Sequence, residues 1–115
     1  GGRVASLLAS EFRPELPISG VICYGFPFHP PKKLDKYRGE HLAQMLTPTL
    51  ILQGERDLFG TREEVQAYEL SQQVKVAYLG DGDHSFKPRV KSGFTLATNM
   101  QQAAKLTLDF MSAAR

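Results

Sequence analysis

Residues 48–57, Pro-Thr-Leu-Ile-Leu-Gln-Gly-Glu-Arg-Asp, decide the fold of this chain. A proline opens the stretch, an apolar run follows, and glycine and charged residues close it, which is typical of a buried strand that runs into a loop. Residues 74–86 repeat the pattern, with an apolar run over 74–79 and then Gly-Asp-Gly-Asp-His-Ser-Phe. We therefore predict two parallel strands that carry Asp57 and His84 just past their carboxyl ends, where open α/β sheets build their sites.

A helix is predicted between these two strands. Thr61 is followed three residues later by Glu64, which forms a capping box after the turn residue Gly60. The interval of 27 residues between Asp57 and His84 leaves room for this helix and for the next strand. The spacing suits one strand-helix-strand unit.

The rest of the chain completes an alternating order of elements. The pattern predicts a helix over residues 4–12, a strand over 18–24, a short helix over 40–46 and a closing amphipathic helix that begins at Leu96. The predicted apolar face of that last helix consists of Leu96, Met100, Ala103, Ala104, Thr107, Phe110 and Met111. Strands separated by helices indicate the α/β class, with a mostly parallel sheet flanked by helices.

Composition limits the classes of function. The 115 residues, 42% of them hydrophobic, fit one small domain over residues 1–115. A net charge of +2 is too slight to favour nucleic-acid binding, and the basic residues near Lys33 are interrupted by Asp35, which favours a solvated loop. No apolar run approaches the roughly 20 residues of a membrane span, so no membrane partner is expected.

The cysteine and histidine content also limits the chemistry. A single cysteine, Cys23, cannot form an intrachain disulfide, and its apolar neighbours favour a core position, so a cytoplasmic protein is expected. Three scattered histidines do not form a metal site, and we expect no metal and no cofactor. His29 and His41 lack a strand-end context and are interpreted as structural or exposed.

Four segments together resemble a known family. Residues 1–6, 23–28, 50–57 and 82–86 are similar, in their order and spacing, to the C-terminal half of the α/β-hydrolase family. More narrowly, they resemble its branch related to dienelactone hydrolases. The resemblance covers essentially the whole chain and implies that residues 1–115 form the C-terminal part of one α/β-hydrolase domain.

The resemblance implies a role for each member of a catalytic triad. In that family the nucleophilic serine, the acid and the base follow in this order along the chain. His84 then corresponds to the general base and Asp57 to the acid that orients it. Gly1 and Gly2 match the glycines after the nucleophile, which places the serine two residues before Gly1 and leaves the oxyanion donors outside the chain. We therefore expect the parent protein to be a serine hydrolase acting on small esters, lactones or related carbonyl compounds, and this chain to be inactive alone.

Alternatives stay open for these residues. Asp57 could simply cap a turn, and His84 could be an ordinary loop histidine. Asp81 and Asp83 are rivals for the acid, although so close to His84 they are better suited to shaping its turn. Ser6, Ser19 and Ser85 are candidates to replace the nucleophile, but Ser85 adjoins His84 and is badly placed to face its ring, and neither Ser6 nor Ser19 lies at a strand-to-helix elbow. Glu55 and Arg56 are expected to form a local ion pair.

Three aromatic residues are candidates for substrate binding. Tyr24 and Phe26 follow the first strand, and Phe59 follows Asp57, so all three lie on the rim predicted for the site. Core packing is an equally good interpretation of each. Residues 30–38 could cover the site, given their length.

Two further expectations concern partners and the second class of function. Three parallel strands would leave one apolar sheet edge bare, so we expect either a complementary N-terminal half or self-association through that edge. A small ester-like molecule is the expected ligand. The alternative function is a non-catalytic pseudo-hydrolase module for binding or assembly; a flavodoxin-like nucleotide binder lacks a phosphate loop.

Overall fold

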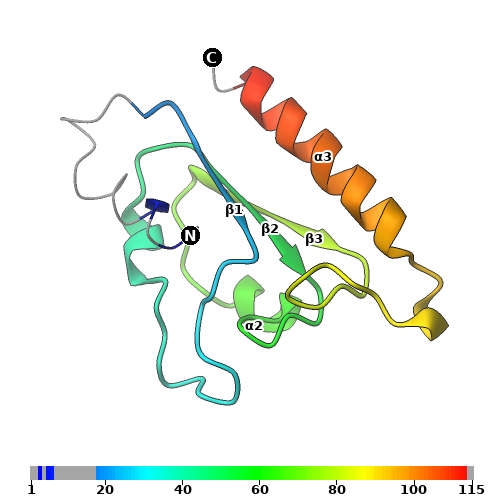
Figure 1. Ribbon diagram of the computed structural model, residues 1–115. Helices are drawn as coiled ribbons and strands as arrows, with labels where there is room; N and C mark the ends of the chain where they lie inside the picture. The colour runs from blue at the N-terminus through cyan, green and yellow to red at the C-terminus, as the bar shows by residue number, and fades with distance from the viewer. Residues whose placement is uncertain (1–2, 4, 7–17, 114–115) are drawn as a thin grey trace.

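The computed structural model describes residue 3, residues 5–6 and residues 18–113. Its centre is a three-stranded parallel sheet with the order β1 (Val21–Tyr24), β2 (Thr49–Gly54) and β3 (Val74–Leu79), as Figure 1 shows. Cys23 pairs with Ile51, and Ile51 pairs with Val76. The prediction of an α/β protein with a parallel sheet is confirmed.

The middle strand β2 is buried along its whole length. All six of its residues are buried, whereas β1 and β3 are covered only in part. An uninterrupted apolar run is what a parallel strand needs when layers cover both of its faces. The first predicted strand is shorter than expected, because its ladder begins at Val21, opposite the first residue of β2, Thr49.

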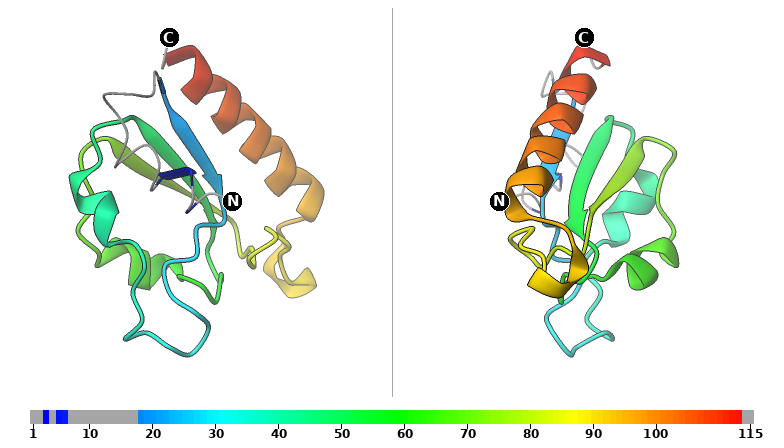
Figure 2. Two further views of the ribbon diagram at one scale, coloured as in Figure 1. Left: turned by 60° about the vertical axis from the view of Figure 1, so that its left-hand side comes forward. Right: turned by 90° about the vertical axis from the view of Figure 1, so that its right-hand side faces the viewer.

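The sheet separates two layers (Figure 2). The long helix α3 (Leu96–Ala113) crosses one face, and the short helix α2 (Arg62–Gln66) and the 3₁₀ turn η1 (Glu40–Gln44) lie on the other. Because side chains alternate along a strand, Ile51 joins the cluster on the α2 side, while Leu50 and Leu52 join the cluster on the α3 side.

The two hydrophobic clusters differ in size. On the α2 side, the buried members are Val21, Cys23, Phe26, Phe28, Leu42, Met45, Ile51 and Val65. On the α3 side they are Leu50, Leu52, Leu79, Phe86 and Ala103. The prediction that Cys23 belongs to the core is confirmed, and burial raises the pKa of its thiol to about 11.

The predicted start of α2 is confirmed. The Thr61 hydroxyl accepts a hydrogen bond from the Glu64 backbone N–H, and the Glu64 carboxylate accepts one from the Thr61 N–H at 2.9 Å. The helix has only five residues, and Val65 is its one buried residue. Such a short helix depends on its cap and on the burial of Val65 in the core, because isolated helices of this length are unstable in water.

The closing helix α3 exists as predicted, but its predicted apolar face is only partly right. Ala103 is buried and Phe110 packs beside it, whereas Leu96, Met100 and Met111 are each 43–55% exposed. The other buried residue of α3 is Asn99, a polar residue outside the predicted face. The helix is therefore rotated so that part of its apolar surface faces away from the sheet.

Two other predictions concern the N-terminal region and the short helix. The helix predicted over residues 4–12 lies largely outside the described residues. The short helix predicted over 40–46 is present as η1, and Leu42 is buried in it. No helix within the described part of the chain is long and apolar enough to cross a membrane.

We expect Leu52→Ala to lower the free energy of unfolding by about 2–5 kcal/mol, because it leaves a cavity in the fully buried centre of β2. Urea denaturation monitored by circular dichroism measures this loss. Leu46→Ala removes the same atoms from a side chain that is 66% exposed, and we expect it to cost well under 1 kcal/mol. Equal losses for the two variants would contradict the described core.

Candidate functional site

Asp57 and His84 meet at the carboxyl edge of the sheet. Asp57 follows β2 by three residues and His84 follows β3 by five. The Nδ1 atom of His84 lies 2.8 Å from Oδ2 of Asp57. Because an ionised carboxylate only accepts hydrogen bonds, Nδ1 is the donor, and in the neutral ring Nε2 then carries the free electron pair.

The two members of the pair have opposite exposure. Asp57 is completely buried, and its second oxygen, Oδ1, accepts a hydrogen bond from the Phe59 backbone N–H at 2.8 Å. The His84 side chain is 45% exposed, and its Nε2 forms no hydrogen bond with any residue in the described ranges. The pair therefore consists of a fixed buried acid and a ring that can take up or release a proton at its other nitrogen.

Two glycines allow the loops to approach this closely. A Cβ atom on Gly54, at the end of β2, would lie 2.2 Å from the Asp83 carbonyl oxygen. A Cβ atom on Gly25, which has a φ of 76°, would lie 3.1 Å from Cε1 of His84. Only a residue without a side chain lets the His84 loop pass over the end of β2 and beside the exit of β1.

Phe59, one of the three aromatic residues predicted as candidates for substrate binding, contacts the ring of His84. Its ring centroid is 4.5 Å from that of His84, with an angle of 39° between the planes. The half-buried ring covers one face of the imidazole, and so limits how the ring can turn. Phe59 thus lies beside the Asp57–His84 pair, and a role for it in substrate binding stays a prediction.

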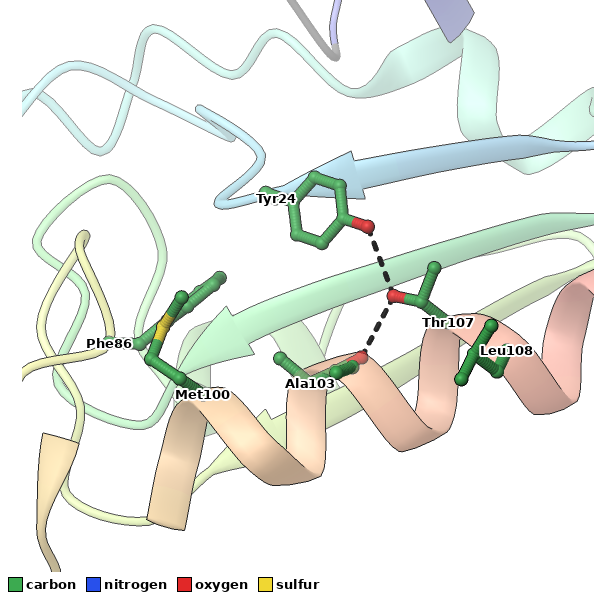
Figure 3. A pocket seen from close by; sticks show the side chains of 7 residues that line it. Tyr24, Phe86, Met100, Ala103, Thr107 and Leu108 are labelled. Atoms are coloured by element: carbon green, nitrogen blue, oxygen red, sulfur yellow. Dashed lines mark hydrogen bonds between the residues drawn. The ribbon is translucent and has the colours of Figure 1, made fainter. Parts of the chain in front are cut away.

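Tyr24 lies on the same rim, at the end of β1, but faces α3. Its hydroxyl group lies 3.0 Å from Oγ1 of Thr107, and the Thr107 hydroxyl donates to the Ala103 carbonyl (Figure 3). Tyr24 lines an open apolar pocket of about 400 Å³ that reaches Phe86, two residues after His84. The other lining residues are Met100, Ala103, Ala104, Thr107 and Leu108.

Phe26 is a correction to the predicted site. Its side chain is fully buried and packs against Phe28, with ring centroids 4.7 Å apart, so it presents no surface to a ligand in this structure. Its backbone has a different role. Phe26 donates its N–H to Oε1 of Gln53 and accepts from Nε2 of Gln53, which also donates to the Gly60 carbonyl.

Gln53 was missed by the sequence analysis. It is the next-to-last residue of β2 and is fully buried, and its amide joins the loop after β1 to the loop after Asp57. The sequence did contain a signal for this role, because Gln53 is a polar residue at the end of an apolar strand. A buried amide needs hydrogen-bond partners, so such a residue is expected to link neighbouring segments.

Charged residues hold the His84 loop at its base. Asp81, at a φ of 53°, accepts from the Arg89 side chain at 2.7 and 3.1 Å and from the Arg89 backbone N–H at 2.8 Å. Glu55 accepts from the Asp81 N–H at 2.7 Å. The predicted ion pair between Glu55 and Arg56 is wrong: Glu55 pairs with Arg62 and Arg56 pairs with Asp81, because the chain brings these more distant groups together.

The other histidines have structural surroundings. His29 is buried, with Nδ1 2.8 Å from the Pro30 carbonyl oxygen and Nε2 2.9 Å from Oε1 of Glu64. Burial acts to lower the pKa of His29, but the Pro30 carbonyl and the Glu64 carboxylate outweigh it and raise this pKa above its usual value. Both acceptors favour the doubly protonated ring, which ties the loop after β1 to α2.

The Ser6 side chain forms a hydrogen bond with the His41 ring. The Ser6 hydroxyl lies 2.8 Å from Nε2 of His41, but it is fully buried and donates to the Arg3 carbonyl, as a helical serine does. This arrangement gives Ser6 a structural role. Among the described residues, no group of three or more His, Cys, Asp or Glu side chains is arranged to hold a metal ion.

A family model matches almost the whole chain. The model of a family described as an alpha/beta hydrolase domain matches residues 1–112. Neither the search of curated proteins nor that of solved structures gives a significant match.

We expect Asp81→Asn to destabilise the protein at pH 7, because hydrogen bonds from Arg89 hold the pKa of Asp81 well below its usual range. The stabilisation that a lowered pKa gives is present above about pH 4, the usual Asp value, and is lost as the pH falls towards the pKa of the folded state. The difference in unfolding free energy between wild type and variant should therefore shrink below pH 4.

Urea titrations at a series of pH values measure this difference. Asp35→Asn, in an exposed loop position, is the matched control and should leave stability unchanged over the same pH range. A difference for Asp81→Asn that stays constant between pH 7 and pH 3 would contradict the role of its charge.

Proposed function

The chain belongs to the α/β-hydrolase family, and from this membership we propose that it forms the C-terminal part of a serine hydrolase. The proposed substrates are small esters, lactones or related carbonyl compounds, which react through an acyl-enzyme. The observation that carries the proposal is the hydrogen bond of 2.8 Å between the buried Asp57 and the half-exposed His84.

The geometry suits His84 as a general base. A serine hydroxyl becomes a strong nucleophile only when a neighbouring group takes its proton, and Nε2 of His84 has the free electron pair to do so. The imidazolium that forms would be stabilised by Asp57, which also keeps the ring in the required tautomer. The same Nε2 would then return the proton to the leaving alcohol, and a second cycle with water would release the acid.

The nucleophile is proposed to be a serine two residues before Gly1, supplied by a preceding segment. No serine in the described part of the chain hydrogen bonds to His84. Ser85 is adjacent to His84, and its backbone N–H is held by the Asp83 carboxylate in the turn. Ser6 is buried against His41. We therefore propose a serine that approaches Nε2 of His84, at the edge of the ring, from a segment outside these residues.

Substrate contacts are proposed for two of the predicted aromatic residues. Phe59 borders the His84 ring, and Tyr24 borders the apolar pocket beside Phe86. The narrower placement in the branch related to dienelactone hydrolases rests on the sequence resemblance, and a comparison of lactone with open-chain ester hydrolysis tests it. The cytoplasmic location stays a prediction that rests on the single cysteine.

The proposed partner of the exposed sheet edge is the same preceding segment. β1 is an edge strand, and the exposed side chains of Tyr24, Met100 and Leu108, which are 50–64% exposed, border the pocket beside it. Apolar surface next to an unpaired strand edge favours the addition of another strand.

A fluorophosphonate probe tests the proposed nucleophile. We expect no labelling of the 115-residue chain, and labelling of a single serine in the complete gene product. Asp57→Asn in that product should slow labelling by about 10³–10⁴-fold, because His84 loses its orienting partner. Ser85→Ala is the control and should label at the wild-type rate.

Either of two results would contradict this proposal. Labelling of the 115-residue chain itself would show that a nucleophile lies within it. A complete gene product that begins at Gly1, or that has an unrelated domain before it, would favour the non-catalytic module instead.

Sedimentation of the 115-residue chain tests the exposed edge. We expect association that depends on concentration, because β1 and the apolar side chains of α3 lack the proposed neighbour. Met100→Lys with Leu108→Lys should reduce the association, since both side chains are largely exposed and the charges oppose apolar contact. A stable monomer with protected amides throughout β1, β2 and β3 would refute the need for a partner.

A further inference from the structure

Asn99 is the polar residue that α3 buries against the sheet. It is 2% exposed, and it lies one turn before Ala103, the other buried residue of the helix. Asparagine is a weak helix former, and burying its amide is unfavourable unless hydrogen bonds satisfy it. Its position therefore calls for an explanation in terms of what the amide contacts.

The Asn99 amide bridges the two ends of the His84 loop. Its Nδ2 donates to the Gly80 carbonyl oxygen and to the Phe86 carbonyl oxygen, both at 3.0 Å. Gly80 is the first residue after β3, and Phe86 is the residue at which the turn around His84 closes. The NH₂ group of Asn99 thus donates both of its hydrogens, one to each of the two carbonyl groups that lie on either side of His84 in the chain.

The bracketed loop needs such a constraint. Phe86 has a φ of 68°, in the left-handed region that a large side chain rarely adopts. Its N–H donates to the Asp83 carbonyl, and the Gly82 N–H donates to the Leu79 carbonyl, so the loop consists of two tight turns in succession. The charged contacts of Asp81 hold the base of the loop, and Arg56 also spans it, with Nε 2.9 Å from the Asp81 carbonyl oxygen and Nη2 3.5 Å from that of Lys87. Asn99 differs from Arg56 in being buried, and both of its hydrogen bonds are 3.0 Å long.

From this geometry we propose that Asn99 is a positioning residue for His84: by holding the Gly80 and Phe86 carbonyls at a fixed separation, its amide keeps the imidazole of His84 within hydrogen-bond distance of Asp57. The inference rests on the proposed function only for its effect on catalysis. The effect on the ring itself follows from the contacts alone. Asn99 touches neither substrate nor reacting atoms in this role.

The direct test is proton exchange at Nδ1 of His84, followed by NMR in the complete gene product uniformly labelled with ¹⁵N. Asn99→Leu keeps the approximate volume of the side chain and favours the helix, but it removes both donors. We expect the Nδ1 proton of His84 to exchange at least about tenfold faster in this variant, while the amide of Ile51 in β2 keeps its wild-type rate. Asp57→Ala identifies the resonance, because it removes the acceptor.

The control distinguishes positioning from general destabilisation. Gln102→Leu makes the corresponding change on the exposed side of α3 and should leave the exchange at His84 unchanged. If Asn99→Leu speeds exchange at Ile51 and at His84 by the same factor, Asn99 is merely structural and the proposal is wrong. Unchanged exchange at His84 would also overturn it.

A measurement without substitution covers the case in which Asn99→Leu does not fold. Both hydrogens of the Asn99 NH₂ group should show scalar couplings across hydrogen bonds to the carbonyl carbons of Gly80 and Phe86. The absence of both couplings in the folded wild type would refute the bridge.

Measurement of ester hydrolysis by the Asn99→Leu variant tests this inference separately from the proposed function. In a gene product that hydrolyses esters, Asn99→Leu should lower kcat by about 10- to 100-fold with little change in KM, because a small misplacement of the base slows the reaction without removing substrate contacts. If the wild-type product hydrolyses nothing, the proposed function fails, and the exchange at His84 still decides the role of Asn99.

Discussion

The burial of β2 on both faces and at both edges is the constraint on which the rest of the structure depends. Leu50 and Leu52 pack towards α3, Ile51 packs towards α2, and parallel ladders hold the strand on either side. A strand enclosed in this way can neither slip by one residue nor tilt, since a slip would turn its apolar side chains to the opposite layers. The point at which the chain leaves the sheet is therefore determined.

The site is built outward from that exit point. Gln53 uses its side-chain amide to hold the Phe26 and Gly60 backbones, and Gly54 lets the His84 loop cross directly over the strand. The loops at this rim are thus fixed by hydrogen bonds to β2, the strand that is buried along its whole length. Short loops anchored to a rigid sheet are the usual way for a parallel α/β fold to hold catalytic groups in place.

Asp57 and His84 have different surroundings, and these suit them to different roles. Asp57 is buried and uses both carboxylate oxygens on internal donors, so its position is closely defined. His84 is held by one nitrogen and one ring face, and its other nitrogen points away from the hydrogen-bonded acid. Membership of the α/β-hydrolase family is consistent with this division, because a base must be oriented from within and must meet its reaction partner from outside.

Local sequence patterns determined the three strands, the capping box of α2 and the candidacy of Asp57 and His84, because strand pattern, caps and strand ends depend on residues close together in the chain. Only the tertiary structure decided which groups meet. Arg56 pairs with Asp81 and not with its neighbour Glu55, Phe26 turns into the core, and α3 buries Asn99 in place of part of its apolar stripe. These outcomes depend on the distances between elements far apart in sequence, and on the need of each buried polar group for a partner, which no local pattern contains.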